Sequence, residues 1–307
     1  MKGLEAARRL YAEKGADIIH EHFPEYEGRI AVGLAGSGSQ CLGFDDEISR
    51  DHDFEPGFCL WLTDADDARI GIELSRKTRS LFGSRVSQAS ALGTAGVGVM
   101  RISDFYRRFT GLPGAPETWQ DWLYLPSYAL AQAVSGEVFR DDLGEFSRIR
   151  HDIACCMPED VRRKKLAARL ALMAQSGQYN YARCLARGED GAAMLAVSEF
   201  VKNTAEAVFL LNRRHAPYYK WLLRGMRGLE KLGELSDALE FLLTGDNDED
   251  GKVLKSQVIE DICAQIVSEL RAQGLSCGSW DYLEKHAFDV QSHIENAAIR
   301  ALHIMEG

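Results

Sequence analysis

The stretch that decides the fold reads Ala31-Val-Gly-Leu-Ala-Gly-Ser-Gly-Ser39. It is an apolar run that ends in a glycine–serine turn, and Asp51-His-Asp53 follows after a short polar segment. Alternate side chains of a strand point to the same face, so a strand over 51–62 would project both carboxylates into one space. The pattern therefore predicts a buried strand over 29–35, an open turn, and two carboxylates on the next strand.

These residue types suit a metal–nucleoside triphosphate complex. Mg²⁺ is usually held by one or two carboxylates plus substrate phosphates, so Asp51 and Asp53 are the candidate metal ligands and catalytic residues. The turn offers backbone N–H groups and hydroxyls with little side-chain bulk, which lets phosphates come close. Catalysis at such a site works mostly by positioning and charge neutralisation. We expect four residues to bind the triphosphate: Gly36, Ser37, Gly38 and Ser39.

The spacing between these two motifs resembles the signature of the nucleotidyltransferase superfamily related to polymerase beta. Thirteen residues separate Ser37 from Asp51, and eleven separate Ser39 from Asp51, both within that signature's tolerance. The whole string from Gly36 to Asp53 is similar to an uncharacterised bacterial branch, a domain of unknown function. The resemblance implies Mg²⁺-dependent transfer of a nucleoside monophosphate from ATP, or another nucleoside triphosphate, to a hydroxyl.

One position departs from the superfamily pattern. Many members use a third carboxylate on a later strand, and the resemblance would place it within a strand over 97–102, where this chain has Gly98. Either the two aspartates suffice, or another acid takes the role, or catalysis has been lost. The candidate acids are Glu137 and Asp141, around a predicted strand over 137–140.

Helical patterns flank these strands. Apolar periodicity predicts a helix over 3–22. Asp64 is a candidate cap for a helix that runs to about residue 81, and Asp104 is a candidate cap for a later helix. The small, polar residues of 83–96 predict a loop.

From Pro158 onward the pattern changes to long helices. Pro158-Glu-Asp160 makes a favourable first turn, and a seven-residue apolar repeat predicts a last helix over 283–304 that serves as a packing seam or a homodimer contact. The acidic stretch 245–251 lacks the ligand spacing of a calcium loop and predicts a solvated turn. We expect an α/β domain with a small mixed sheet and flanking helices over 1–150, and an all-α helical bundle over 151–307.

A nucleotidyltransferase core followed by a helical bundle resembles the antibiotic nucleotidyltransferases that act on kanamycin, streptomycin-class drugs and lincosamides. The segment Asn212-Arg-Arg-His-Ala-Pro-Tyr-Tyr-Lys-Trp221 is similar to a bundle segment of that group in which a lysine reaches back toward the triphosphate. By that resemblance, Lys220 would neutralise β/γ-phosphate charge. The alternative is an exposed lysine beside a core Trp221.

Composition narrows the class of protein. The chain has 307 residues and a net charge of −10, which argues against a general nucleic-acid binder. Its seven cysteines form no CxxC pair, which predicts reduced thiols in a cytoplasmic protein, with Cys155 and Cys156 in the core. We expect no membrane span and no signal peptide, because no apolar run is long enough.

The acceptor is left open by the sequence. The first hypothesis is a small hydroxylated molecule, antibiotic-like, and an acidic cleft would favour a cationic one. The second is transfer of AMP to a protein, as in toxin–antitoxin pairs. The third is a catalytically silent nucleotide-binding or scaffold protein, prompted by Gly98.

Overall fold

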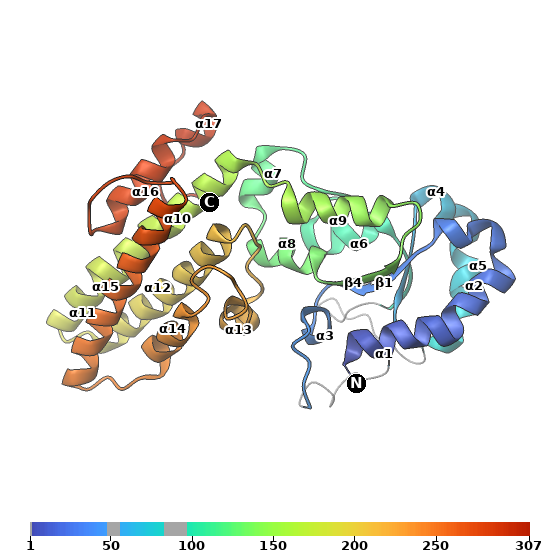
Figure 1. Cartoon of the computed structure of the whole chain (residues 1–307), viewed down its shortest axis with the longest axis horizontal. Coiled ribbons are helices and arrows are strands. Elements are labelled where there is room, and N and C mark those ends of the chain that lie inside the picture. Colours follow the sequence, from blue (N-terminus) through green and yellow to red (C-terminus); the bar gives the residue numbers. More distant parts are fainter. Residues whose placement is uncertain (1, 48–55, 83–96) are drawn as a thin grey trace. The chain divides into compact units, whose positions relative to one another are not determined.

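The computed structural model describes residues 2–47, 56–82 and 97–307. A small four-stranded mixed sheet with helices forms the N-terminal part, and a largely helical region follows (Figure 1). The chain divides into two compact units. The sheet unit comprises Met1–Pro116 and Ala129–Cys156, and the helical unit comprises Glu117–Tyr128 and Met157–Gly307.

The sheet has the order β3-β2-β1-β4. Strand β1 pairs antiparallel with both β2 and β4, while β2 pairs parallel with β3. All residues of β1 are buried, so the prediction of a buried strand over 29–35 is confirmed. Of the strand expected over 51–62, residues 56–62 are described, and only 59–62 of these form a strand; residues 56–58 are not assigned to it. The strands are β1 (Ala31–Ala35), β2 (Cys59–Leu62), β3 (Gly98–Arg101) and β4 (Gly136–Arg140).

Helices cover both faces of the sheet. On one face, Leu34 and its neighbours pack in a core with Ile19 of α2 and Leu74 of α5. On the other face, the Trp61 ring stacks on Phe146 of α9, with 3.9 Å between ring centroids. This alternation follows from the two-residue period of a strand. The helical segments are α1 (Gly3–Leu10), η1 (Tyr11–Gly15), α2 (Ala16–His22), η2 (Pro24–Arg29), α3 (Ser39–Leu42), α4 (Asp64–Asp66), η4 (Asp67–Gly71), α5 (Ile72–Thr78), η5 (Arg79–Leu81), α6 (Ile102–Thr110), α8 (Ser127–Val134, shared between the units) and α9 (Glu145–Cys155).

The two expected aspartate caps are wrong, although both helices form. Thr63 caps α4, and its Oγ1 accepts a hydrogen bond from the Asp66 backbone N–H at 3.1 Å. Asp64 instead accepts from the Ser103 hydroxyl at 2.6 Å. Asp104 lies inside the first turn of α6, because that helix begins directly after β3. Asp64 is the first residue of α4 and Asp104 is the third residue of α6, so neither aspartate occupies the cap position.

Cys155 and Cys156 are exposed, so the expectation that they are core thiols is wrong. Helix α9 buries Phe146, Ile149 and Ile153, which form one stripe at helical spacing. The two cysteines fall off that stripe at the end of the helix.

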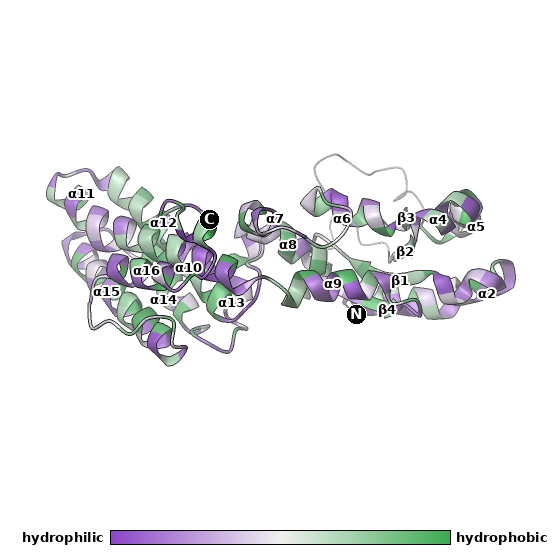
Figure 2. Cartoon of the chain, turned by 90° about the horizontal axis from the view of Figure 1, so that it is seen from above, coloured by the Kyte–Doolittle hydropathy of each residue, from purple (hydrophilic) through white to green (hydrophobic). Residues whose placement is uncertain are grey.

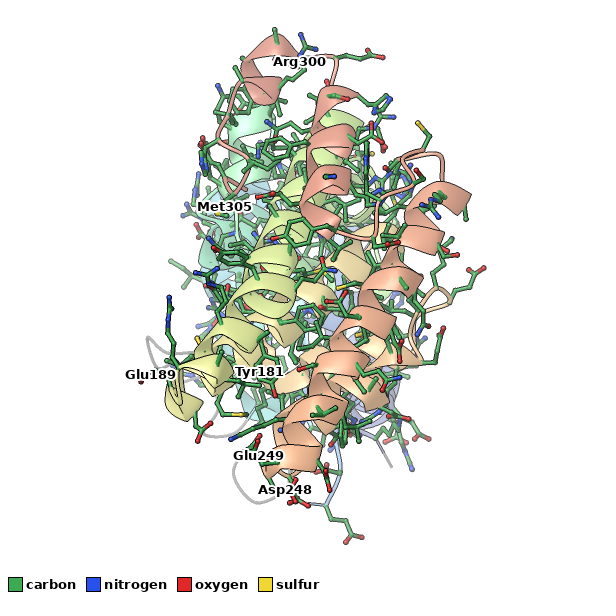
Figure 3. The ribbon with its side chains drawn as sticks, turned by 90° about the vertical axis from the view of Figure 1, so that its left-hand side faces the viewer. Tyr181, Glu189, Asp248, Glu249, Arg300 and Met305 are labelled. Carbon is green, nitrogen blue, oxygen red and sulfur yellow. The ribbon has the colours of Figure 1, made fainter. Side chains whose placement is uncertain are left out.

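The helical unit packs its longest helices around one core. Fully buried side chains from α10, α12, α15 and α16 meet there, including Leu166, Phe200, Ile266 and Val290. Most helices carry both apolar and polar residues along their length (Figure 2), as amphipathic helices do. The segments are α7 (Trp119–Tyr124), α10 (Glu159–Met173), the π-helical η7 (Ala174–Tyr181, Figure 3), α11 (Ala182–Ala186), α12 (Asp190–Leu211), η8 (Tyr219–Trp221), α13 (Leu222–Met226), α14 (Leu235–Thr244), α15 (Glu249–Ala272), α16 (Leu283–Ser292) and α17 (Ala297–Arg300).

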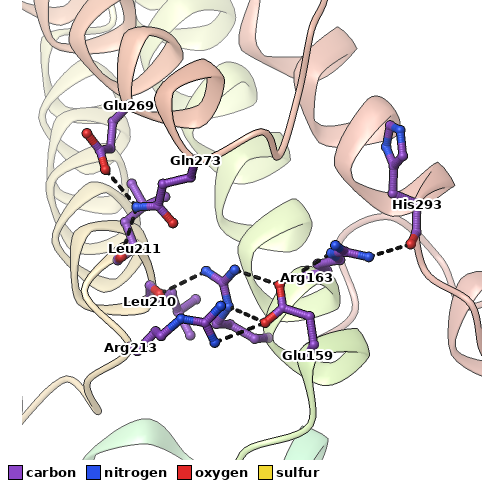
Figure 4. A network of polar contacts seen from close by, with 9 residues as sticks. Glu159, Arg163, Leu210, Leu211, Arg213, Glu269, Gln273 and His293 are labelled. Carbon is purple, nitrogen blue, oxygen red and sulfur yellow. Dashed lines mark hydrogen bonds and ion pairs between the residues drawn. The ribbon is translucent and has the colours of Figure 1, made fainter.

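The C-terminal end of α12 is closed by side chains from two other helices (Figure 4). The last carbonyls of a helix have no partner within it. Here the Arg162 guanidinium donates to the Leu210 carbonyl at 3.2 Å, and the Gln273 amide donates to the Leu211 carbonyl at 3.0 Å. Arg162 is buried and also pairs with Glu159 at 2.7 Å. These hydrogen bonds connect the end of α12 to α10 and to the residue that follows α15.

The last helix is broken, contrary to the prediction of one helix over 283–304. The Asp160 carboxylate accepts hydrogen bonds from the backbone N–H groups of Glu295 and Asn296 at 3.1 and 2.8 Å. The Asn296 side chain then caps α17 by accepting from the backbone N–H of Ala298. Such side-chain bonds compete with helix continuation and separate α16 from α17. No described helix is both long and apolar enough to span a membrane.

Candidate functional site

The glycine–serine turn follows the central strand directly. Gly36 has φ +115° and Gly38 has φ +110°, a backbone conformation that glycine adopts without steric cost. The Gly36 N–H donates to the Ser135 carbonyl at 3.3 Å, and a Cβ on Gly36 would stand 2.8 Å from the Phe109 ring. The turn is thus held between β4 and α6, and its shape depends on both glycines.

The second feature of the turn is its pair of serine hydroxyls, which have no hydrogen-bond partner among the described residues. Ser37 and Ser39 are half-buried, and Ser39 is the first residue of α3. Neither hydroxyl forms a hydrogen bond with any described residue, although the Ser39 carbonyl accepts from the Phe44 N–H at 2.9 Å. A ligand could therefore bind both hydroxyls without breaking a hydrogen bond between described residues.

The predicted metal ligands Asp51 and Asp53 lie outside the described residues. Across 2–47, 56–82 and 97–307, no three side chains of His, Cys, Asp or Glu gather as a metal site would require.

The two candidate acids of β4 lie at opposite ends of that strand. Glu137 is opposite Leu34, beside the turn, and forms an ion pair with Arg8. Asp141 follows the other end of β4, about 13 Å further along at the usual rise per residue. Its carboxylate accepts from the backbone N–H groups of Gly144 and Ser147 at 3.1 and 2.7 Å, and so organises the start of α9. The structure does not bring these two acids together.

Gly98 is the residue at which the sequence resemblance led us to expect a third carboxylate. It starts β3 opposite Cys59 and has φ +107°. Any other side chain in that backbone conformation would be strained. Strand β3, all of whose residues are described, contains no aspartate or glutamate.

Lys220 belongs to the helical unit, whereas the glycine–serine turn belongs to the sheet unit. Lys220 lies in η8, is exposed, and places its Nζ 5.0 Å from the centroid of the Trp221 ring. Trp221 is half-buried. The ammonium group of Lys220 therefore faces solvent and makes a cation–π contact with the Trp221 ring.

Arg150 is a candidate site residue that the sequence did not reveal. Its Nη2 donates to the Gly136 carbonyl at 2.5 Å, and its Nη1 is buried without a hydrogen-bond partner among the described residues. Burial lowers the pKa of Arg150. Gly136 pairs with Ala35, the residue before the turn, so Arg150 places a positive charge behind the glycine–serine turn. In the sequence, Arg150 is indistinguishable from the exposed Arg148 of the same helix.

Comparison with known families gives one similarity. Residues 122–222 match the model of a domain of unknown function, DUF4037. The match covers Lys220 but not the glycine–serine turn or the two aspartates. No curated protein and no solved structure matches the chain.

The two ends of the matched segment meet within the helical unit. The Ala216 N–H donates to the Ser127 hydroxyl at 2.7 Å, and the Tyr128 and Tyr218 rings make an edge contact at 5.7 Å between centroids. The start of the segment therefore supports the stretch that carries Lys220.

Proposed function

We propose that the chain is an Mg²⁺-dependent nucleotidyltransferase that moves a nucleoside monophosphate from ATP, or another nucleoside triphosphate, to a hydroxyl of a small acceptor. The observation that carries this proposal is the turn Gly36–Ser39, which follows a fully buried central strand and contains two glycines at positive φ. Its serine hydroxyls form no hydrogen bond with another described residue. The sequence resemblance to the nucleotidyltransferase superfamily suggests the transfer reaction and the role of Asp51 and Asp53 as metal ligands.

The residues of the turn would bind the triphosphate. Small residues let phosphate oxygens approach the backbone N–H groups, and Ser37 and Ser39 add hydroxyl donors. Arg150 supplies positive charge from behind the turn, without a carboxylate partner among the described residues. Lys220 is proposed to contribute charge to the β/γ-phosphates from the helical unit, by the resemblance given above.

In the proposed reaction, the acceptor oxygen forms a bond to the α-phosphorus while the bond from that phosphorus to the β-phosphate oxygen breaks. Pyrophosphate leaves, and the hydroxyl proton passes to a base. When bound by Asp51 and Asp53, Mg²⁺ would neutralise phosphate charge and lower the pKa of the acceptor hydroxyl. Among the described acids, Glu137 is the candidate base, because it lies beside the turn; Arg8 would have to release it.

A second candidate function is nucleotide binding without transfer. Three observations favour it: Gly98 stands at the expected carboxylate position, Glu137 is paired with Arg8, and Asp141 organises a helix start. A chain with this set of contacts could retain the triphosphate site and lack the base.

The test is a transfer assay with α-labelled nucleoside triphosphates, Mg²⁺ and a panel of hydroxylated acceptors that includes aminoglycosides. We expect label transfer and pyrophosphate release in equal amounts. A Ser37→Ala/Ser39→Ala variant should lose at least tenfold in rate, because two hydrogen bonds to charged oxygens are removed, worth roughly 1.5 kcal/mol or more each.

The matched control is Ser75→Ala/Ser80→Ala, two serines on the helical segment 72–81 of the same unit without a described hydrogen bond. Its rate should equal that of the wild type. Transfer that is insensitive to the turn serines contradicts the proposed site, and nucleotide binding without any transfer favours the silent alternative.

A further inference from the structure

The helical unit contains a cavity that the proposed transferase site does not use. It has a volume of about 210 Å³ and lies where η7 and α11 meet the first turns of α12 and α15. Figure 3 shows Tyr181 at the same end of this unit as Glu189, Asp248 and Glu249. The side chains that matter here are Tyr181, Leu185, Asp190, Ala193, Met194 and Lys252.

Tyr181 is the most informative of these residues. The residue is 1% exposed, and its hydroxyl forms no hydrogen bond with any described residue. The hydroxyl is not among the buried polar atoms that lack a partner within the described residues, so it reaches the solvent-accessible space of the cavity. Because Tyr181 lines the cavity, a molecule inside the cavity is the natural partner for this hydroxyl. Burial also raises the pKa of Tyr181, which keeps the phenol neutral.

The backbone around Tyr181 is unusual as well. Tyr181 is the last residue of η7, a π-helical segment eight residues long that interrupts the helical run between α10 and α11. Turns of this type are rare and frequently occur at functional sites.

The polar groups at the cavity are mostly acceptors. Lys252 already pairs with Asp190 and with Glu249, each at 3.1 Å. Lys255 is buried and donates to the Gly245 carbonyl and to the Asn247 side-chain oxygen. The two stretches that line the cavity, 181–194 and 246–255, together contain six acids and four basic residues, Arg183, Arg187, Lys252 and Lys255. The local field therefore favours a positive ligand.

We propose that this cavity binds a small aliphatic amine. Its ammonium donates to the Asp190 carboxylate and to the Tyr181 phenol oxygen, and its alkyl chain packs against Leu185, Ala193 and Met194. A carboxylate would meet like charge at Asp190. A cavity of about 210 Å³ limits the ligand to a small molecule, and a five-carbon amine is the size chosen for the test. The site is independent of the proposed transferase function.

The experiment uses the full chain labelled with ¹³C at the methionine methyl groups. The Met194 signal, assigned with Met194→Leu, reports occupancy of the cavity during titration with isoamylamine, isoamyl alcohol and 4-methylpentanoate. We expect a saturable shift with isoamylamine in the millimolar range, weaker binding of the alcohol and none of the carboxylate. Asp190→Asn should weaken the amine at least tenfold, and Tyr181→Phe about fivefold.

Matched controls separate this site from general attraction to an acidic surface. Asp250→Asn removes an exposed acid from the first turn of α15, and Tyr179→Phe removes an exposed phenol two residues before Tyr181. Both should bind isoamylamine as the wild type does. The proposal is overturned if isoamylamine gives no saturable Met194 shift, if the carboxylate binds more tightly, or if the test variants, shown to be folded by circular dichroism, bind as tightly as the controls.

Discussion

Replacing Gly136 by alanine tests how the sheet holds the glycine–serine turn. Gly136 is the first residue of β4, lies opposite Ala35 and has φ +87°. A Cβ at this position would stand 2.1 Å from the Leu34 carbonyl oxygen and 2.6 Å from the Ala35 Cα. These are backbone atoms, so β1 or β4 would have to move to admit the methyl group.

Two costs add at this position. An L-residue in a left-handed backbone conformation costs roughly 1–2 kcal/mol, and forcing a methyl group into a packed site costs roughly 1–3 kcal/mol more. Gly144→Ala is the matched control, because Gly144 has φ +71° but no atom within 4 Å of an added Cβ. Gly136→Ala should therefore destabilise the sheet by about 1–3 kcal/mol more than Gly144→Ala does.

The assay is native-state hydrogen exchange read by mass spectrometry on a peptide that covers β1. The opening free energy of the β1 amides should fall in both variants, and further in Gly136→Ala. Equal losses of protection in the two variants would show that β1 and β4 accommodate the methyl group freely. The account of a rigidly held turn would then be wrong.

Three further predictions concern both units. Burial lowers the pKa of Lys165 to about 8 from 10.5, so between these pH values the unfolded chain binds more protons than the folded chain and the free energy of unfolding rises with pH. In urea unfolding, the wild type should gain up to about 3 kcal/mol relative to Lys165→Met between pH 7 and pH 10.5. A stability difference between the two proteins that does not change with pH would contradict this prediction. Lys220→Gln should weaken nucleoside triphosphate binding at least fivefold in calorimetry, whereas the control Lys202→Gln, which changes an exposed lysine of α12, should bind as the wild type does. Equal affinities of the two variants would show that Lys220 does not contact the triphosphate. In the native protein, a thiol reagent should label the exposed Cys155, Cys156 and Cys277 within the dead time of mixing, and should label the buried cysteines only on unfolding. Labelling of all cysteines at one rate would contradict the observed burial.

Local patterns predicted the elements of the fold well. The apolar run before Gly36 predicted the central strand, and the apolar periodicity over 3–22 predicted the first helical segments of the chain. These features depend on residues close together in the chain. The same is true of the glycine–serine turn, whose two glycines have the backbone conformation that only glycine adopts readily.

Other features depended on contacts between distant residues. The Asp160 carboxylate interrupts the last helix although it is more than a hundred residues away in the chain. The residues at 293–296 show no local pattern that predicts this interruption. The π-helical segment that ends at Tyr181 and the burial of the Arg150 Nη1 atom likewise have no signature in the sequence, because packing decides both. The third carboxylate stays a prediction: Glu137 lies beside the turn, and Asp141 lies at the other end of β4.

The most direct test of the central claim is calorimetric titration of the folded chain with a nonhydrolysable nucleoside triphosphate, with and without Mg²⁺. The account predicts Mg²⁺-dependent binding by the wild type and by Glu21→Ala/Glu25→Ala, an exposed acid pair of the same unit, and loss of that binding in Asp51→Ala/Asp53→Ala. Absence of binding by a folded wild type, or binding that survives removal of both aspartates, would contradict it.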